Sequence, residues 1–391
     1  MEYLIEKERE FFLQTYKRLP IIVDYAKGTK IYDIYGNEYL DFLGGIAVNV
    51  VGHSHPEVIS AIEDQIHRYM HLSNYFYQDV QINYASRFLE VTKYDKLFFT
   101  NSGTEANEGA LKIVRRWGNQ RQKNKVISFA GGFHGRTYGS LSLMDKPQYK
   151  ELMDPFLDGI SIVEYNDIQS FKKVVGFDTA GVFLEFLQGE GGLRKVSQEF
   201  VDELWELKSK YNFLVVADEV QSCMFRTGKL FAFEHYNVVP DVVTVAKGFG
   251  GGLPLGAILV QSHLKDIFER GMHGTTFGGN PVACAAGLAT FNVLYPKMIP
   301  QILEVSEYLW KRLTEVQNKF PSKVLEVRGI GLMCGLLLNF EAIRLVEKLL
   351  EFKIIANATA RNVLRLVPPL VITIEDVDKF ILGLENALSK V

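Results

Sequence analysis

The chain has 391 residues, a net charge of −3, and hydrophobic and charged fractions of 47% and 23%, which are ordinary for a globular protein. Its pI of about 6.3 leaves no basic excess to neutralise a nucleic-acid backbone, which argues against sequence-independent nucleic-acid binding. The charged start of the chain and the lack of any run of 18 apolar residues predict neither a secretory signal nor a membrane span.

The chain has three cysteines, Cys223, Cys284 and Cys334. Their spacing fits neither a disulfide framework nor a zinc site, so we expect a reducing compartment. A soluble, cytoplasmic protein of enzyme size is the expectation.

The first 45 residues carry two short strand-like segments, 29–34 and 38–43, joined by the turn Tyr-Gly-Asn-Glu. A helix is predicted over 56–70 and another over 104–117, because apolar residues recur in each at helical spacing. These residues are Val58, Ile62, Ile66 and Met70 in the first helix and Ala106, Ala110, Ile113 and Trp117 in the second.

Short apolar runs without polar alternation alternate with these helical stretches. Such runs are typical of strands that are buried on both faces of a parallel sheet covered by helices. The alternation predicts an α/β fold with a mostly parallel, seven-stranded sheet. The seven strands are expected at 96–100, 125–129, 161–165, 181–186, 213–220, 241–246 and 256–260.

The pattern changes after about residue 291. There we expect a helix, a hairpin around 326–338, another helix, a strand at 363–368 and a final helix over 375–389. We predict a large central domain, residues 46–290, and a smaller α+β lobe built from the two chain ends, 1–45 and 291–391.

A strand that ends at Thr100 precedes a helix that begins near Thr104. Asn101, Ser102, Gly103 and Thr104 therefore lie at a helix N-terminus, where free N–H groups and hydroxyls form a site for phosphate. Because serine and threonine are also favoured as plain helix caps, this stretch alone leaves both interpretations open.

Asp218 and Glu219 lie near the carboxyl end of an apolar strand, where open α/β sheets bind ligands. A buried acid there needs a partner, such as a cation or a protonated ring nitrogen. A metal-binding or purely structural carboxylate is the alternative.

Lys247 directly follows another apolar strand. A desolvated lysine has a lowered pKa and can form a Schiff base with a carbonyl, although a surface lysine remains the alternative. The glycines after it, Gly248 to Gly252, would let a cofactor approach the backbone closely.

A phosphate site, an acid for a ring nitrogen and a Schiff-base lysine occur in this order, each at a strand end. Pyridoxal 5'-phosphate (PLP) requires these protein groups. The chain resembles class III aminotransferases of PLP fold type I, and within them the acetylornithine aminotransferases. The matching stretches are 39–58, 71–78, 98–112, 129–142, 188–192, 217–221, 246–257, 273–284 and 362–370.

The resemblance implies a role for each matching residue around the cofactor. Lys247 binds the cofactor covalently and moves the proton, and Asp218 bonds the pyridine nitrogen. Gln221 reaches the phenolic oxygen, while Val220 and Phe133 pack on opposite faces of the ring. Ser102, Gly103 and Thr104 form the phosphate site, and Thr276 reaches the phosphate in the neighbouring subunit of a homodimer with shared active sites.

The resemblance also implies substrate contacts. Arg136 binds the α-carboxylate of an acylated ornithine, with Thr275 next to the substrate, and Tyr16 lies where relatives place a substrate-contacting tyrosine. Glu190 and Arg365 form a pair that changes partners between the two half-reactions. The reaction implied moves the terminal amino group of N2-acetylornithine to 2-oxoglutarate and gives N-acetylglutamate 5-semialdehyde and glutamate, a step of arginine biosynthesis.

Several alternatives stay open. Relatives act on succinylornithine, ornithine, acyl-diaminopimelate, acyl-lysine or 4-aminobutyrate, and pocket volume and a few contacts decide among them. A nicotinamide oxidoreductase would need Gly-x-Gly-x-x-Gly after an early strand, and no such run occurs. His53 and His55 lack a third ligand nearby, so we expect no metal. The family's proline after Glu185 is replaced by Phe186, which puts the local backbone path in question.

Overall fold

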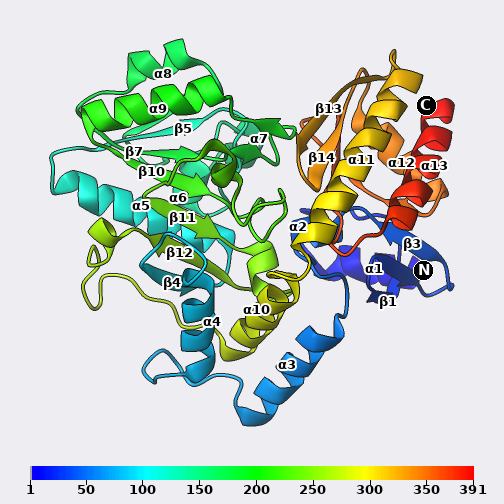
Figure 1. Ribbon diagram of the computed structural model, residues 1–391, viewed down its shortest axis with the longest axis horizontal. Helices are drawn as coiled ribbons and strands as arrows, with labels where there is room; N and C mark the ends of the chain where they lie inside the picture. The colour runs from blue at the N-terminus through cyan, green and yellow to red at the C-terminus, as the bar shows by residue number, and fades with distance from the viewer. Residues whose placement is uncertain (1) are drawn as a thin grey trace.

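The computed structural model describes residues 2–391, and a seven-stranded sheet forms its centre (Figure 1). The strand order is β4-β12-β11-β10-β7-β5-β6, and β12 alone runs against its neighbours. The strands are β4 (Lys96–Thr100), β5 (Lys125–Phe129), β6 (Ile160–Val163), β7 (Thr179–Leu184), β10 (Leu214–Asp218), β11 (Val242–Val245) and β12 (Gly256–Val260). The predicted fold class and all seven strands are confirmed, with boundaries that differ by up to two residues.

Both faces of this sheet are buried, which explains the lack of polar alternation in its strands. Leu214 and Val216 of β10 pack with α5 (Gly103–Asn119), whereas Val215 and Ala217 join the core on the other face with α9 (Gln198–Tyr211). Successive side chains of a strand point to opposite faces, so each strand needs apolar residues at every position. The predicted helix over 104–117 is α5, and the one over 56–70 is α3 (Pro56–Arg68).

The two chain ends meet in a shared sheet of order β1-β2-β3-β15. Strand β3 (Glu38–Asp41) pairs in parallel with β15 (Ile354–Ile355), and Phe42 stacks on Phe380 of α13 (Ile374–Lys390) with ring centroids 4.0 Å apart. Figure 1 shows both termini on the same side of the molecule. The N-terminal strands are β1 (Val23–Lys27) and β2 (Lys30–Asp33).

A second four-stranded sheet, β13-β14-β17-β16, is built entirely from the C-terminal part. The predicted hairpin is present as β13 (Val324–Ile330) and β14 (Met333–Leu338), and the predicted strand is β17 (Val363–Leu366) beside β16 (Asn357–Thr359). Helices α11 (Ile299–Lys319), α12 (Ala342–Glu351) and α13 accompany it. The division into domains at residues 45 and 290 stays a prediction.

The remaining elements are short or connect these sheets. They are α1 (Glu2–Phe11), α2 (Gly44–Ala47), α4 (Asp79–Leu89), α6 (Tyr138–Ser142), α7 (Pro147–Lys150), α8 (Ile168–Val174), α10 (Pro281–Leu294), β8 (Leu187–Gln188), β9 (Arg194–Lys195) and the 3-10 turns η1 (Ala232–Tyr236), η2 (Lys247–Gly250) and η3 (Ser262–Leu264). Within residues 2–391 no single helix is long and apolar enough to cross a membrane. Helices α10 and α11 reach the necessary length and apolar composition only when they are taken together, and the two are bent by 73° relative to each other.

Candidate active site

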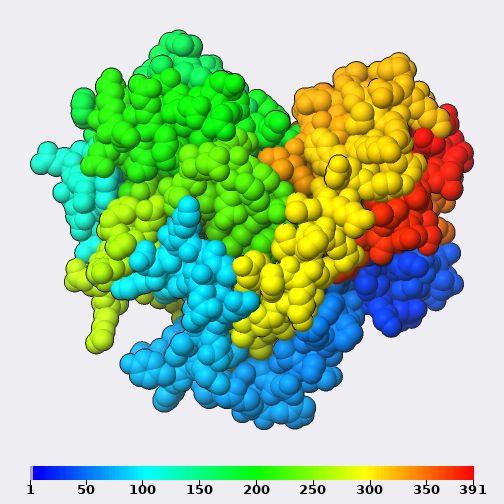
Figure 2. Space-filling model, in the orientation of Figure 1, coloured from blue at the N-terminus to red at the C-terminus, as the bar shows by residue number. Residues whose placement is uncertain are grey.

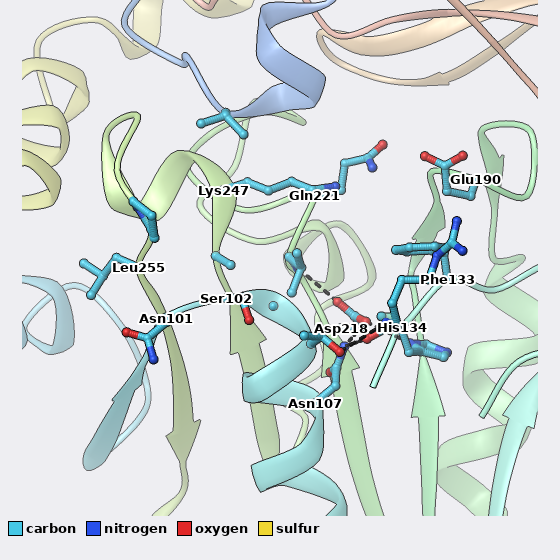
Figure 3. Close-up of a pocket in the computed structure, with 18 of the residues that line it drawn as sticks. Asn101, Ser102, Asn107, Phe133, His134, Glu190, Asp218, Gln221, Lys247 and Leu255 are labelled. Carbon is cyan, nitrogen blue, oxygen red and sulfur yellow. Dashed lines mark hydrogen bonds and ion pairs between the residues drawn. The ribbon is translucent and has the colours of Figure 1, made fainter. Parts of the chain in front are cut away.

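A cavity of about 460 Å³ lies at the carboxyl ends of the parallel strands β4, β10 and β11 (Figure 3). Most of the predicted site residues lie at or just after the ends of these strands, and the sheet brings them together. Ten of the predicted site residues line it: Ser102, Gly103, Thr104, Phe133, Arg136, Glu190, Asp218, Val220, Gln221 and Lys247.

The N-terminus of α5 forms one wall of this cavity. Ser102 is the N-cap and its Oγ accepts a hydrogen bond from the Glu105 N–H at 3.3 Å. The first N–H groups of an α-helix have no acceptor inside the helix, so they are available to an anion. Gly103 packs tightly, since a Cβ atom there would lie 2.6 Å from Cγ1 of Val220.

Asp218 is buried at the base of the cavity and held by three hydrogen bonds. Its Oδ2 accepts from Nδ2 of Asn107 at 2.7 Å and lies 2.8 Å from Nδ1 of His134, and its Oδ1 accepts from the Val220 N–H at 3.1 Å (Figure 3). Burial would lower the pKa of His134, but the hydrogen bond and charge of Asp218 outweigh burial and raise it. The carboxylate is therefore fixed in orientation.

The neighbouring acid, Glu219, is directed away from the cavity. Its carboxylate accepts hydrogen bonds from Oγ of Ser222 at 2.6 Å and from the N–H groups of Ala232 and Phe233 at 2.8 and 3.1 Å, which hold the start of η1. Burial raises the pKa of Glu219 to about 7. Of the two adjacent acids, Glu219 is structural and only Asp218 lines the cavity.

Lys247 follows β11 and extends across the cavity toward Gln221 (Figure 3). The surface-lysine alternative is wrong, because the part of this half-buried side chain that remains accessible faces the cavity. Burial and the nearby charge of Arg365 lower its pKa to about 8, against the opposing effect of Glu190. Its backbone has φ of +51°, a left-handed conformation that is uncommon outside glycine.

The glycines after Lys247 do not all serve the cavity. Gly251 has φ of +61° and lies against α10, where a Cβ atom would be 2.7 Å from the carbonyl oxygen of Ala286. Gly252 lines the cavity. At Gly251 the group that approaches the backbone is therefore a helix of the same chain, and the expected approach of a cofactor to these glycines stays a prediction.

Glu190 and Arg365 form an ion pair at the cavity, although 175 residues separate them in sequence. The Arg365 side chain in β17 is 2% exposed and that of Glu190 is 28% exposed. Arg365 also donates from Nε to Oδ1 of Asn357 at 3.1 Å and from Nη1 to Oε1 of Gln221 at 3.3 Å. Burial would raise the pKa of Glu190, but Arg365 outweighs it and lowers the pKa.

Phe133 and Arg136 lie on the turn between β5 and α6, and both line the cavity. The Phe133 N–H donates to Oε2 of Glu185 at 2.9 Å, and burial raises the pKa of Glu185 to about 7. Glu185 directly follows β7 and lines the cavity, and Phe186, which stands in place of the family's proline, is buried. Arg136 is exposed, and no carboxylate in residues 2–391 forms an ion pair with it.

Arg365 does not line the cavity itself but contacts Glu190 and Gln221, which do, and three further predicted site residues lie outside the cavity in this chain. Thr276 is exposed, and Oγ1 of Thr275 accepts from Nδ2 of Asn101 at 3.2 Å. Tyr16 is 76% exposed and lies in the N-terminal segment beside Arg18. The structure does not bring these three residues together with Lys247.

Two contacts of Asp218 were missed at the level of sequence. Asn107 is a polar residue on the buried, otherwise apolar face of α5, and its Oδ1 accepts from Oγ1 of Thr244 at 2.9 Å. A polar residue between Ala106 and Ala110 on a buried helix face was the signal in the sequence that could have indicated this contact. The histidine contact carried no signal, because His134 and Asp218 are 84 residues apart.

His53 and His55 have local roles. Nε2 of His53 lies 2.7 Å from Oδ2 of Asp41, and Nδ1 of His55 accepts from the Glu57 N–H at the start of α3. Among the residues that the structure describes, no group of three or more histidine, cysteine or acidic side chains is arranged to hold a metal ion.

The donor set fits a phosphorylated aldehyde with a basic ring. A long helix begins at the cavity with its N–H groups available, a fixed carboxylate stands at its base, and an amine of lowered pKa points into it. These are the groups that PLP requires.

The comparisons with known proteins agree with this geometry. The family model described as class-III aminotransferase matches residues 12–388. The chain therefore belongs to the class III aminotransferases, and PLP is the cofactor of this family.

Individual relatives are similar over the whole chain. Acetylornithine aminotransferases of Methanocaldococcus jannaschii and Aquifex aeolicus are each 40% identical; the alignments cover 100% and 97% of this chain and 99% and 100% of theirs. Two solved structures are also similar. Ornithine aminotransferase from Toxoplasma gondii has a TM-score of 0.94 and 30% identity, covering 100% of this chain and 94% of that one. Acetylornithine aminotransferase from Elizabethkingia anophelis has a TM-score of 0.89 and 32% identity, covering 100% and 99%.

Proposed function

We propose that this aminotransferase moves the terminal amino group of N2-acetylornithine to 2-oxoglutarate, giving N-acetylglutamate 5-semialdehyde and glutamate, a step of arginine biosynthesis. The observation that carries the proposal is the Glu190–Arg365 ion pair beside Lys247, because it suits two unlike substrates. The full-length similarity to acetylornithine aminotransferases supports this choice of donor.

We propose that the chain holds PLP through the residues at its strand ends. The N-terminus of α5 takes the phosphate, Asp218 takes the ring nitrogen and Lys247 takes the aldehyde carbon. When bound, PLP acts as an electron sink that stabilises negative charge on the substrate carbon. Asp218 keeps a proton on the ring nitrogen. Lys247, whose pKa is about 8, then accepts a proton from the substrate carbon and returns it.

The ion pair accounts for two unlike substrates in one cavity. N2-acetylornithine has no charged group next to its reacting carbon, and its carboxylate lies at the far end of the molecule. We propose that Arg136, whose guanidinium has no ion-pair partner among the described side chains, binds that carboxylate. Glutamate carries a carboxylate next to the reacting carbon, which needs an arginine near Lys247. Glu190 neutralises Arg365 for the first substrate and moves aside for the second, when the substrate carboxylate replaces it.

The active unit is proposed to be a two-fold dimer. Large exposed apolar side chains form a patch on the surface. They are Met70, Leu72, Tyr75, Phe76, Tyr77 and Phe277. Most of the patch lies on residues 70–77, the segment between α3 and α4, which is at the lower edge of the molecule in Figure 2. Patches of this kind mark protein interfaces.

The same patch is joined to the loop of Thr276. Nδ2 of Asn74 donates to the carbonyl oxygens of Thr275 and Gly278, each at 3.2 Å, and Nδ2 of Asn280 donates to that of Met70 at 3.0 Å. A second copy that covers the patch would therefore meet Thr276, and two-fold symmetry would build two equivalent shared sites.

The buried, unpaired thiols of all three cysteines support a reducing compartment, and we propose the cytoplasm.

A donor panel tests the proposed function. kcat/KM is measured with 2-oxoglutarate and each of N2-acetylornithine, N2-succinylornithine, ornithine, acyl-lysine, acyl-diaminopimelate and 4-aminobutyrate. We expect N2-acetylornithine to have the highest value. If any other donor had a higher kcat/KM, that donor would be the substrate instead. The assignment of the chain to the class III aminotransferases would not change.

A further inference from the structure

The guanidinium of Arg136 rests on an aromatic ring from a different segment. Its Cζ lies 3.5 Å from the ring centroid of Tyr149 in α7 and 5.7 Å from that of Phe133. The rings of Phe133 and Tyr149 meet edge to face, with centroids 6.4 Å apart and planes at 88°. The three side chains therefore form one stacked group at the cavity wall, here called the aromatic–arginine stack.

The stack leaves the hydrogen-bonding edge of Arg136 free. A planar guanidinium can place its face on an aromatic ring and still offer its N–H groups in a fork that matches a carboxylate. No hydrogen bond or ion pair of the Arg136 side chain to residues 2–391 competes for that fork. Its backbone is fixed separately, because its N–H donates to Oγ1 of Thr104 at 3.2 Å.

The segment that carries Tyr149 is anchored beside the same turn. The Gly131 N–H, two residues before Phe133, donates to Oδ1 of Asp145 at 2.9 Å. The Tyr149 N–H in turn donates to the carbonyl oxygen of Lys146 at 2.9 Å. These contacts anchor the backbone on both sides of the aromatic–arginine stack.

Tyr149 also lies at a second hollow of the surface. With Glu190 and Thr359 it lines this hollow, which has a volume of about 420 Å³. A long, exposed arginine side chain loses rotamer freedom when it binds a ligand, and a pre-formed stack removes part of that cost.

We infer that Tyr149 is a positioning residue that holds the guanidinium of Arg136 ready for the remote carboxylate of the amino donor. The inference rests on the proposed function, because only a donor with a carboxylate at its far end uses this fork. Tyr149 would thereby set the preference for donors with that carboxylate over donors without it.

The test compares two amines that differ only in the carboxylate. N-acetyl-1,4-diaminobutane has the acetamide, chain length and reacting amine of N2-acetylornithine but lacks the carboxylate. The ratio of kcat/KM for the two amines is measured for the holoenzyme of the wild type, Tyr149→Ala and Tyr149→Phe. Tyr138→Ala is the matched control, since Tyr138 stacks on Phe156 at 5.6 Å in the neighbouring segment.

Cation–π contacts range from exposed to desolvated sites, which corresponds to about a 2- to 30-fold effect. We expect Tyr149→Ala to lower the ratio by that factor, mainly through KM of N2-acetylornithine, while Tyr149→Phe and Tyr138→Ala leave it within about twofold. In an Arg136→Ala background, Tyr149→Ala should change the ratio no further. An equal loss with both amines, or an unchanged ratio in Tyr149→Ala, would overturn the inference.

A second measurement does not depend on the substrate. Phenylglyoxal reacts with accessible guanidinium groups, and peptide mass spectrometry reports the rate at Arg136. The rate should rise several-fold in Tyr149→Ala but not in Tyr149→Phe. Equal modification rates of Arg136 in the wild type and all variants would overturn the inference about the stack. In the amine assay, a wild type that used neither amine would show instead that the proposed donor is wrong.

Discussion

Removing Arg365 should separate the two half-reactions of this aminotransferase. Arg365→Ala takes away the cation that the carboxylate of glutamate or 2-oxoglutarate needs beside Lys247. The Arg365 side chain is 2% exposed, so this contact is desolvated, and losing one partner of such a pair costs about 3–5 kcal/mol. That range corresponds to about a 150- to 5,000-fold slower half-reaction with glutamate.

The half-reaction with N2-acetylornithine should change much less. In that half-reaction we expect Arg365 to stay paired with Glu190 and not to bind the substrate, and Glu190 has a further hydrogen bond from Oγ1 of Thr359 at 3.3 Å. The Glu190 side chain is 28% exposed and can be solvated in the variant, so we expect a loss within about tenfold. Glu190→Gln should act in the opposite sense. It frees Arg365, so it should slow the half-reaction with N2-acetylornithine more than the half-reaction with glutamate.

Single-turnover absorbance spectra measure each half-reaction separately. Arg361→Ala serves as the matched control, since Arg361 is an exposed arginine nearby, paired with Glu341, and should affect neither half-reaction. Equal losses in both half-reactions for Arg365→Ala would refute the switching account and leave the ion pair as a structural bridge.

Three further predictions concern the cofactor site and the dimer. Lys247→Ala should bind PLP without a covalent link, so borohydride treatment followed by mass spectrometry should find labelled Lys247 in the wild type and no covalent cofactor in the variant; normal turnover of the variant would remove Lys247 from its role. Asp218→Asn keeps the shape and the contacts to Asn107 but removes the charge, so turnover should fall by about 10²–10⁴ with cofactor still bound, and near-normal steady-state rates would contradict this. Sedimentation should show dimers, and subunit exchange between inactive Lys247→Ala and Thr276 variants should restore some activity, whereas a fully active monomer would exclude the shared site.

The sheet could be predicted because burial on both faces leaves a direct pattern in sequence. Each of the seven strands needs apolar residues on both sides, and the runs around 214–218 and 242–245 are apolar for that reason. The meeting of the two chain ends was also visible as a change in pattern. The pairing of β3 with β15 was not visible, because it joins residues more than 300 positions apart.

The site could be predicted only in part. Lys247, Asp218 and the start of α5 each lie at or just after the carboxyl end of a strand, so sequence order places them at one edge of the sheet. Asp218 and Glu219 looked alike in sequence, yet adjacent residues point to opposite sides and only one reaches the cavity. The Tyr149 contact with Arg136 depends on how an irregular segment returns to the turn after β5, and no periodicity encodes that.

The central claim is that the terminal amino group of N2-acetylornithine moves to 2-oxoglutarate. The most direct measurement uses N2-acetylornithine that carries heavy nitrogen only at its terminal amino group and identifies the products by mass spectrometry. The account predicts glutamate that carries the label, in amounts equal to the semialdehyde formed. Unlabelled glutamate, or no glutamate at all with active holoenzyme, would contradict it.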